Sequence, residues 1–145
     1  MIRTDMAEGR VLGLDWGRAR IGIAISDGDR AVALGRETYE RKDVEDDINY
    51  IRDLALKEEI KLIVLGMPYH MDGNEGESAA GVREFRQALE EKLDIPIETV
   101  DERLTSSEAE RVMLESDLSR EERKSHRDKL AATLILQRFL DREEN

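Results

Sequence analysis

The chain has 145 residues and a mass of 16.6 kDa, which is the size of one compact domain. Its 23 Lys and Arg are outnumbered by 34 Asp and Glu, and the resulting net charge of −11 argues, taken alone, against nucleic acid as a partner. The lack of cysteine excludes disulfides, thiol catalysis and cysteine-bound metals, and no apolar run approaches the roughly 20 residues of a membrane span, so we expect a soluble, cytoplasmic protein without membrane contact.

The N-terminal part of the chain alternates short apolar runs with turns. Residues 1–8 mix both signs of charge and predict a flexible leader, which is followed by one domain over residues 9–145. Strands are predicted at Val11–Trp16 and Arg20–Ser26, on either side of a tight turn, with a third at Ala31–Tyr39. We therefore expect the sheet to begin with an antiparallel hairpin.

Helical and strand-like patterns alternate after this hairpin. Val44, Ile48, Ile51 and Ala55 recur at helical spacing and predict one amphipathic helix. The continuous apolar run Leu62–Gly66 is typical of a strand that is buried on both faces.

The next segment predicts a loop, a helix and a strand. Residues Gly66–Gly76 are rich in turn formers, and Val82, Phe85 and Leu89 then restore helical spacing. A short strand is predicted at Ile97–Val100.

The C-terminal part predicts two helices. Thr105-x-x-Glu108 has the form of a helix capping box. The charged stretch Ser116–Lys129 separates this helix from a last one that carries Leu130 and Phe139. The order β-β-β-α-β-α-β-α-α predicts a three-layer α/β domain, in which helices cover both faces of a mixed five-stranded sheet.

Carboxylates stand at the ends of two predicted strands. Asp15 interrupts an apolar strand just before a glycine, where burial is costly unless the carboxylate is paired or binds a cation; capping of the turn is the alternative. Asp101 and Glu102 follow another strand, and strand ends that converge at one edge would let these acids share a magnesium ion. The alternative is an ordinary turn in which Asp101 caps and Arg103 pairs with Glu102.

Asp128 is the third acidic candidate, and we expect it to start the final helix. Ser125-x-x-Asp128 resembles a capping box, so a purely structural role is the alternative. Arg18 and Arg20 beside the hairpin turn are candidates to hold phosphates. The densest basic cluster of the chain surrounds Asp128, although nearby glutamates also fit a solvated charged face. This cluster comprises Arg120, Arg123, Lys124, Arg127 and Lys129.

Four sequence blocks occur in a characteristic order. They are GLDWGRARIGIAISD (Gly13–Asp27), LGMPYHMDGNEG (Leu65–Gly76), DERLTSSEA (Asp101–Ala109) and DKLAATLILQRFLD (Asp128–Asp141). In order and spacing they resemble the signature of the YqgF family, small bacterial proteins described as pre-16S rRNA nucleases or as Holliday-junction-resolvase-like proteins. The resemblance extends from Gly9 to Asp141 and implies a ribonuclease H-like fold. The second block departs from the usual family pattern at its Met-Pro-Tyr-His segment.

The resemblance also implies which residues carry the chemistry. Asp15, Glu102 and Asp128 match the acidic residues of a nuclease site, with Asp101 as a substitute for Glu102. Such carboxylates would hold one or two Mg²⁺ or Mn²⁺ ions, which activate water and stabilise charge on the scissile phosphate. A loop near this site is assigned to Gly66, Pro68, Asp72 and Gly73.

Hydrolysis by bound metal needs no protein nucleophile, which agrees with the lack of cysteine and of any P-loop or GxSxG motif. The resemblance favours structured RNA as the substrate, above all the 5′ end of pre-16S rRNA in the pre-ribosome, and Holliday-junction resolution on branched DNA is the alternative. Phosphate contacts are assigned to Arg18, Arg20, Arg103, Arg123, Lys124, Arg127 and Lys129. Because these basic residues gather beside the proposed site, the net charge does not exclude phosphate chemistry.

Two other functions remain open from the sequence. A non-catalytic RNA-binding factor for ribosome assembly would use the same basic residues without metal. GLDWG also resembles the first phosphate-binding strand of the actin-like kinases and ATPases. The 145 residues leave no room for the second lobe that closes over ATP, although a dimer could supply it. Either a monomer or a weak homodimer is compatible with the sequence, since a junction resolvase would cut two symmetric strands.

Overall fold

The computed structural model describes residues 9–67, 77–101 and 120–143, apart from the side chains of 77–78, 120–128 and 143. Five strands form a mixed sheet in the order β3-β2-β1-β4-β5. The strands are β1 (Arg10–Trp16), β2 (Arg20–Ser26), β3 (Ala33–Glu40), β4 (Ile60–Met67) and β5 (Ile97–Asp101). The first three strands pair antiparallel, whereas β4 is parallel to β1 and β5 is parallel to β4. The predicted hairpin and mixed sheet are thereby confirmed.

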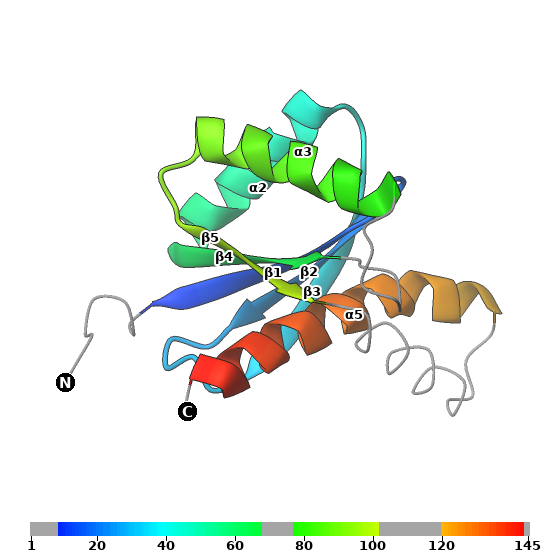
Figure 1. Cartoon of the computed structure of the whole chain (residues 1–145). Helices are drawn as coiled ribbons and strands as arrows, with labels where there is room; N and C mark the ends of the chain where they lie inside the picture. The colour runs from blue at the N-terminus through cyan, green and yellow to red at the C-terminus, as the bar shows by residue number, and fades with distance from the viewer. Residues whose placement is uncertain (1–8, 68–76, 102–119, 144–145) are drawn as a thin grey trace.

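Helices cover both faces of the sheet, as the sequence predicts. Figure 1 shows α2 (Val44–Lys57) and α3 (Glu77–Lys92) on one face and α5 (Arg120–Glu143) on the other. The helix predicted around Thr105, the turn-rich segment after Met67 and the leader lie outside the described residues. No helix within the described ranges is both long enough and apolar enough to span a membrane.

The α2 helix begins where the sequence predicts, but its first residue is not part of the core. Asp43 caps the helix by accepting a hydrogen bond of 2.8 Å from the backbone amide of Asp46. Val44 was expected on the apolar face and is instead exposed, because it lies in the first turn, outside the buried stripe. That stripe consists of Asp47, Ile48, Ile51, Leu54 and Ala55.

The third strand starts two residues later than predicted. The carboxylate of Asp27 accepts hydrogen bonds from the backbone amides of Ala31, at 2.8 Å, and Val32, at 3.2 Å. The hydrogen bond from Val32, and after it the one from Ala31, lowers the pKa of Asp27, because both stabilise the charged carboxylate. The two amides therefore belong to the turn, and ladder pairing begins at Ala33.

Two apolar cores lie on opposite faces of the sheet. On the α2 and α3 face, residues such as Leu14 and Leu65 pack with Phe85 of α3. On the α5 face, Val64 packs with Phe139. Since β1 and β4 contribute to both cores, they are buried on both sides, and this accounts for their nearly continuous apolar sequences.

The α5 helix packs closely on the sheet because a row of small residues crosses three strands. Gly35 of β3 pairs with Ala24 of β2, which pairs with Gly13 of β1. A Cβ atom at Gly13 would lie 2.7 Å from the Cβ of Leu136. A Cβ at Gly35 would lie 2.9 Å from the Oγ1 of Thr133. Because these separations are shorter than van der Waals contact, the helix rests directly on the backbone of both strands.

The start of α5 corrects two predictions. The helix begins at Arg120, so Asp128 lies inside it rather than at its first residue, and Ser125-x-x-Asp128 is not a capping box. The stretch predicted to separate two helices is itself helical from Arg120 onward. The helix extends this far because Arg, Glu and Lys are good helix formers and no glycine or proline interrupts them.

Candidate functional site

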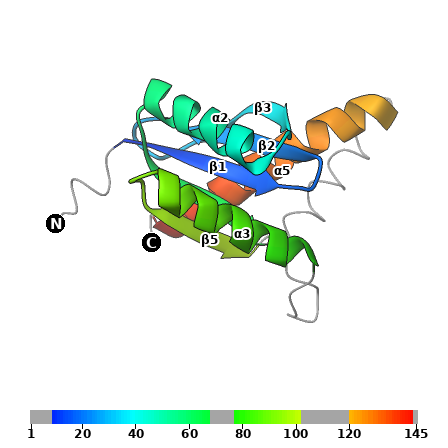
Figure 2. The same cartoon turned by 90° about the horizontal axis from the view of Figure 1, so that it is seen from above.

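The carboxyl ends of β1, β4 and β5 lie at one edge of the sheet, because these three strands run parallel. The turn between β1 and β2 lies at the same edge. Figures 1 and 2 show the N-terminal turns of α5, in orange, extending past this edge. Ligands of open α/β sheets bind outside the carboxyl ends of the strands, so this edge is the candidate functional site.

Asp15 lies on the α5 face of the sheet, near the end of β1. Side chains alternate between the two faces along a strand. Val11 and Gly13, which lie four and two residues before Asp15, both face α5, so Asp15 faces α5 as well. The residue opposite Asp15 on β2 is Gly22. On β4, the last residue paired with β1 is Leu65, and the residue that follows is the glycine at position 66. The positions beside this partly buried carboxylate on both neighbouring strands are therefore glycines, which carry no side chain.

The end of β5 places two successive residues on opposite faces. Val100 belongs to the core beneath α5, so Asp101, one residue later, points to the opposite face, which α2 and α3 cover. Arg138 of α5 donates a hydrogen bond of 3.1 Å to the backbone carbonyl of Asp101, which ties the helix to the end of this strand. Glu102, which follows, lies outside the described residues.

The other predicted site residues are described only in part. Arg18 is exposed in the hairpin turn, Arg20 opens β2, Gly66 is buried near the end of β4 and Lys129 is partly buried in α5. Arg123, Lys124, Arg127 and Asp128 belong to α5, but their side chains are not described. Pro68, Asp72, Gly73, Glu102 and Arg103 fall outside the described ranges.

The described side chains alone do not assemble a metal site. Within residues 9–67, 79–101 and 129–142, no three His, Asp or Glu side chains gather closely enough to hold an ion. Of the three carboxylates implied by the resemblance, the structure therefore places Asp15 only. The backbone position of Asp128 is known as well, one helical turn before Ala132, whose carbonyl lies beside Gly13.

Sequence reasoning missed an ion pair that holds the hairpin turn. Arg41 follows β3 and donates a hydrogen bond of 2.8 Å from Nε to the carboxylate of Asp47 in α2. Asp47 is fully buried. A carboxylate on the buried stripe of an amphipathic helix needs a charged or hydrogen-bonding partner. The position of Asp47 next to Ile48 on this stripe was therefore the sequence signal for such an ion pair.

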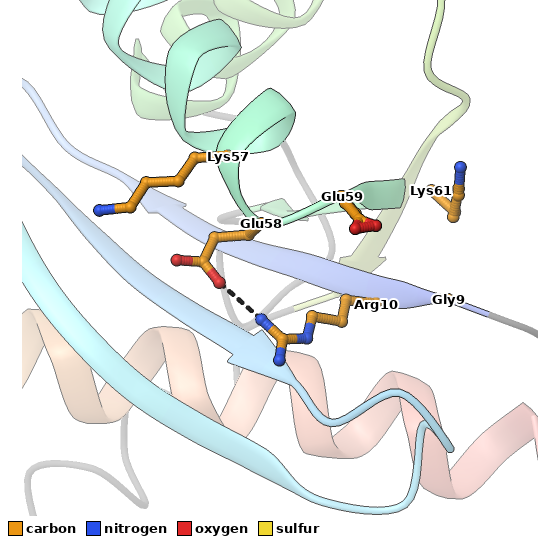
Figure 3. Close-up of a pocket in the computed structure, with 6 residues that line it drawn as sticks. All are labelled: Gly9, Arg10, Lys57, Glu58, Glu59 and Lys61. Atoms are coloured by element: carbon orange, nitrogen blue, oxygen red, sulfur yellow. Dashed lines mark hydrogen bonds and ion pairs between the residues drawn. The ribbon is translucent and has the colours of Figure 1, made fainter.

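A small pocket of about 390 Å³ lies at the opposite end of the sheet and is not the candidate site. It is lined by Gly9, Arg10, Lys57, Glu58, Glu59 and Lys61. Figure 3 shows Arg10 reaching across it to Glu58, and the two side chains form an ion pair with an N–O distance of 2.5 Å. Arg10 precedes Asp15 by about 17 Å along an extended strand, so the pocket and the site edge are separate.

The pocket carboxylate gives a prediction for stability. A hydrogen bond from Arg36 and the positive charges of Arg36 and Arg10 lower the pKa of Glu58. Since the folded-state pKa lies below the unfolded one, the stabilisation is complete above the unfolded-state value and is lost as pH falls through the folded one. We expect Glu58→Gln to lower the free energy of unfolding by about 1 kcal/mol at pH 7, with the difference vanishing once the pH lies below the folded-state pKa of Glu58. Urea titrations of both proteins across this range measure it.

Glu59→Gln is the matched control, because Glu59 lines the same pocket and makes no ion pair with any described residue. An equal loss of stability in the two variants at neutral pH would contradict the assignment to the Glu58 ion pairs.

The strand order and the antiparallel start of the sheet define a ribonuclease H-like fold. Residues of this chain superpose on Thermus thermophilus RuvC in complex with a Holliday junction substrate, with a TM-score of 0.58 at 16% identity, covering 94% of this chain and 97% of that one. The fowlpox virus Holliday junction resolvase gives a TM-score of 0.57 at 11% identity, covering 92% and 99%. These likenesses establish the fold.

The sequence itself defines the family. The chain matches the RuvX family, described as Holliday junction resolvase, over residues 9–142, and it belongs to that family. A relative from Natranaerobius thermophilus, provisionally named pre-16S rRNA nuclease, is 44% identical over 136 residues, which are 94% of this chain and 96% of the relative. A relative of the same name from Syntrophomonas wolfei is 47% identical over 132 residues, covering 91% and 94%.

Proposed function

We propose that this chain is a metal-dependent nuclease that hydrolyses phosphodiester bonds at the edge where β1, β4 and β5 end, in one domain over residues 9–145. Membership of the family and the names of its relatives support nuclease activity. The observation that carries the proposal is the position of Asp15, which lies on the α5 face between strands whose adjacent residues are glycines. A carboxylate flanked by glycines near the end of a strand suits a divalent cation, because such ions prefer oxygen ligands.

Asp15, Glu102 and Asp128 would hold the ion or ions. Glu102 is favoured over Asp101 because Asp101 has the parity of the α2 and α3 face, whereas Asp15 lies on the α5 face. Asp128 is favoured because α5 runs over Gly13, two residues before Asp15. Carboxylate oxygens are the ligands that Mg²⁺ and Mn²⁺ prefer. When bound, such an ion supplies a water of lowered pKa and stabilises negative charge on the phosphate.

Basic residues around the edge would position the nucleic acid backbone. Arg18 is exposed in the hairpin turn. The N-terminal turns of α5 extend past the end of the sheet (Figure 2), and Arg123, Lys124 and Arg127 belong to this part of the helix. Contacts to phosphates fix the register of the bound strand without reading its sequence. Arg20, Lys129 and Arg103 are further candidates of this kind.

We propose structured RNA as the substrate, in particular the 5′ end of pre-16S rRNA, because the relatives at 44% and 47% identity carry that name. The description of the family as Holliday junction resolvase supports branched DNA as the second candidate. Sequencing the ends of rRNA that accumulate when the protein is depleted separates them, since a DNA resolvase would leave these ends unchanged.

Removal of metal tests the activity. We expect purified protein to cleave a pre-16S rRNA fragment or a four-way DNA junction with Mg²⁺ or Mn²⁺ and to lose at least about 100-fold in rate with EDTA. Gel analysis of the cleaved ends measures it, and restored cleavage on adding excess Mg²⁺ is the control. Full activity in EDTA would overturn the metal mechanism, and metal-independent binding without cleavage would identify a non-catalytic binding protein.

A further inference from the structure

One arginine binds the backbone of the whole hairpin turn between β1 and β2. The guanidinium of Arg41 donates from one terminal nitrogen to the carbonyl oxygen of Gly17, at 3.4 Å, and to that of Arg18, at 3.1 Å. Its backbone amide donates to the carbonyl oxygen of Ala19, at 2.9 Å. Three consecutive turn carbonyls are therefore held by a residue that lies just beyond the end of β3.

Arg41 is itself held in a single orientation. Asp47, which is fully buried, accepts from Arg41 Nε at 2.8 Å and from the backbone amide of Lys42 at 2.9 Å. The guanidinium also lies 4.7 Å from the centre of the Trp16 ring. The planar fork thus joins a buried carboxylate, the turn and the residue after Asp15, which a lysine ammonium is unable to do.

Two tyrosines support the carboxylate end of this arrangement. Tyr39 stacks on Tyr50 with ring centres 4.2 Å apart. Burial of the Tyr39 side chain, which is the largest cause, and its hydrogen bond to Asp47, which is the second, raise the pKa of Tyr39 to about 12. Tyr39 therefore stays protonated under all ordinary conditions and keeps its hydrogen bond to the buried carboxylate.

We propose that Arg41, oriented by Asp47, is a positioning residue that fixes the 17–19 turn and thereby holds Arg18 in place to bind a substrate phosphate beside Asp15. The inference rests on the proposed nuclease function, and Arg41 acts through the turn rather than by touching the nucleic acid. Its side chain binds Asp47, Trp16 and the turn carbonyls, whereas Arg18 is exposed at the same edge as the carboxylate.

The experiment measures coupling between the two arginines. Arg41→Lys keeps the charge but removes the fork, and we expect it to raise KM by about tenfold with kcat within about twofold. Arg18→Ala should raise KM by a similar factor and reduce the salt slope of binding by about one, because one phosphate contact is lost. In the Arg18→Ala background, Arg41→Lys should change KM by less than about twofold.

Arg52→Lys is the matched control, since Arg52 is an exposed arginine of α2 that pairs only weakly with Asp53, at 3.8 Å, and should leave KM unchanged. If Arg41→Lys does not fold, Asp47→Asn replaces it, with Asp53→Asn as its control. The backbone amide of Gly17 donates to the carbonyl oxygen of Arg20 within the turn, at 2.8 Å, and its exchange should accelerate at least about tenfold in either substituted protein.

Additive effects of Arg41→Lys and Arg18→Ala on KM, or unchanged amide exchange of the turn, would overturn the positioning role. A wild-type protein that cleaves with metal but shows additivity refutes this inference alone. A wild-type protein that neither cleaves nor binds refutes the proposed function first, and the amide exchange of the turn still shows whether Arg41 holds it.

Discussion

Asp15→Asn should abolish cleavage while leaving the fold intact. Asparagine has nearly the same shape as aspartate but lacks the negative charge that holds a divalent ion, so we expect kcat to fall by at least about 100-fold. Asp15 lies near the end of β1 opposite Gly22, and asparagine keeps the volume of its side chain. Single-turnover cleavage with Mg²⁺ measures the rate, and circular dichroism with thermal unfolding measures the fold.

Asp29→Asn is the control for this substitution, because Asp29 is an exposed aspartate in the turn after β2, at the other end of the sheet. Its rate should match that of the wild type. Retained cleavage in Asp15→Asn, with the Asp29→Asn protein equally active, would remove Asp15 from the catalytic centre and with it the observation on which the proposed function depends.

Gly13→Ala should destabilise the protein and reduce its activity together. The added Cβ would lie 2.7 Å from the Cβ of Leu136 and 3.3 Å from the carbonyl oxygen of Ala132. Neither atom is the end of a flexible side chain, so α5 has to move away from the sheet. We expect the free energy of unfolding to fall by about 2–3 kcal/mol, as in other overpacked cores.

The same movement shifts the helix that carries Asp128 relative to Asp15, so cleavage should fall by at least about tenfold under conditions where the variant is still folded. Urea unfolding and cleavage rates measure the two effects. Gly28→Ala is the control, since a Cβ at Gly28 meets no atom within 4 Å and the residue has no positive φ. Full stability of Gly13→Ala would show that α5 does not depend on close contact at this row of small residues.

Local patterns in the sequence account for most of the fold. The alternation and apolar runs predict all five strands and the helices α2 and α3, because each element buries a face whose period is visible in the sequence. The boundaries that differ have local causes as well. Asp27 binds two amides that the pattern assigns to β3, and the helix-forming residues from Arg120 onward extend α5 beyond its apolar stripe.

The sequence by itself also singles out Asp15, because it is an acidic residue in an otherwise apolar strand. It did not reveal the row of Gly35, Ala24 and Gly13, because these residues are far apart in the chain and only strand pairing brings them to one level. That row decides how closely α5 approaches β1, and therefore where the helix lies relative to Asp15.

The net charge of −11 likewise has one part that the sequence determines and another that only the tertiary structure decides. The sequence alone sets its value. Only the tertiary structure decides that Arg41 is tied to buried Asp47 and to the turn, whereas Arg18 remains exposed at the site edge. The reason is physical: the interaction of a charge depends on its distance from other charges and on its burial, and both are set by packing between segments that are remote in sequence.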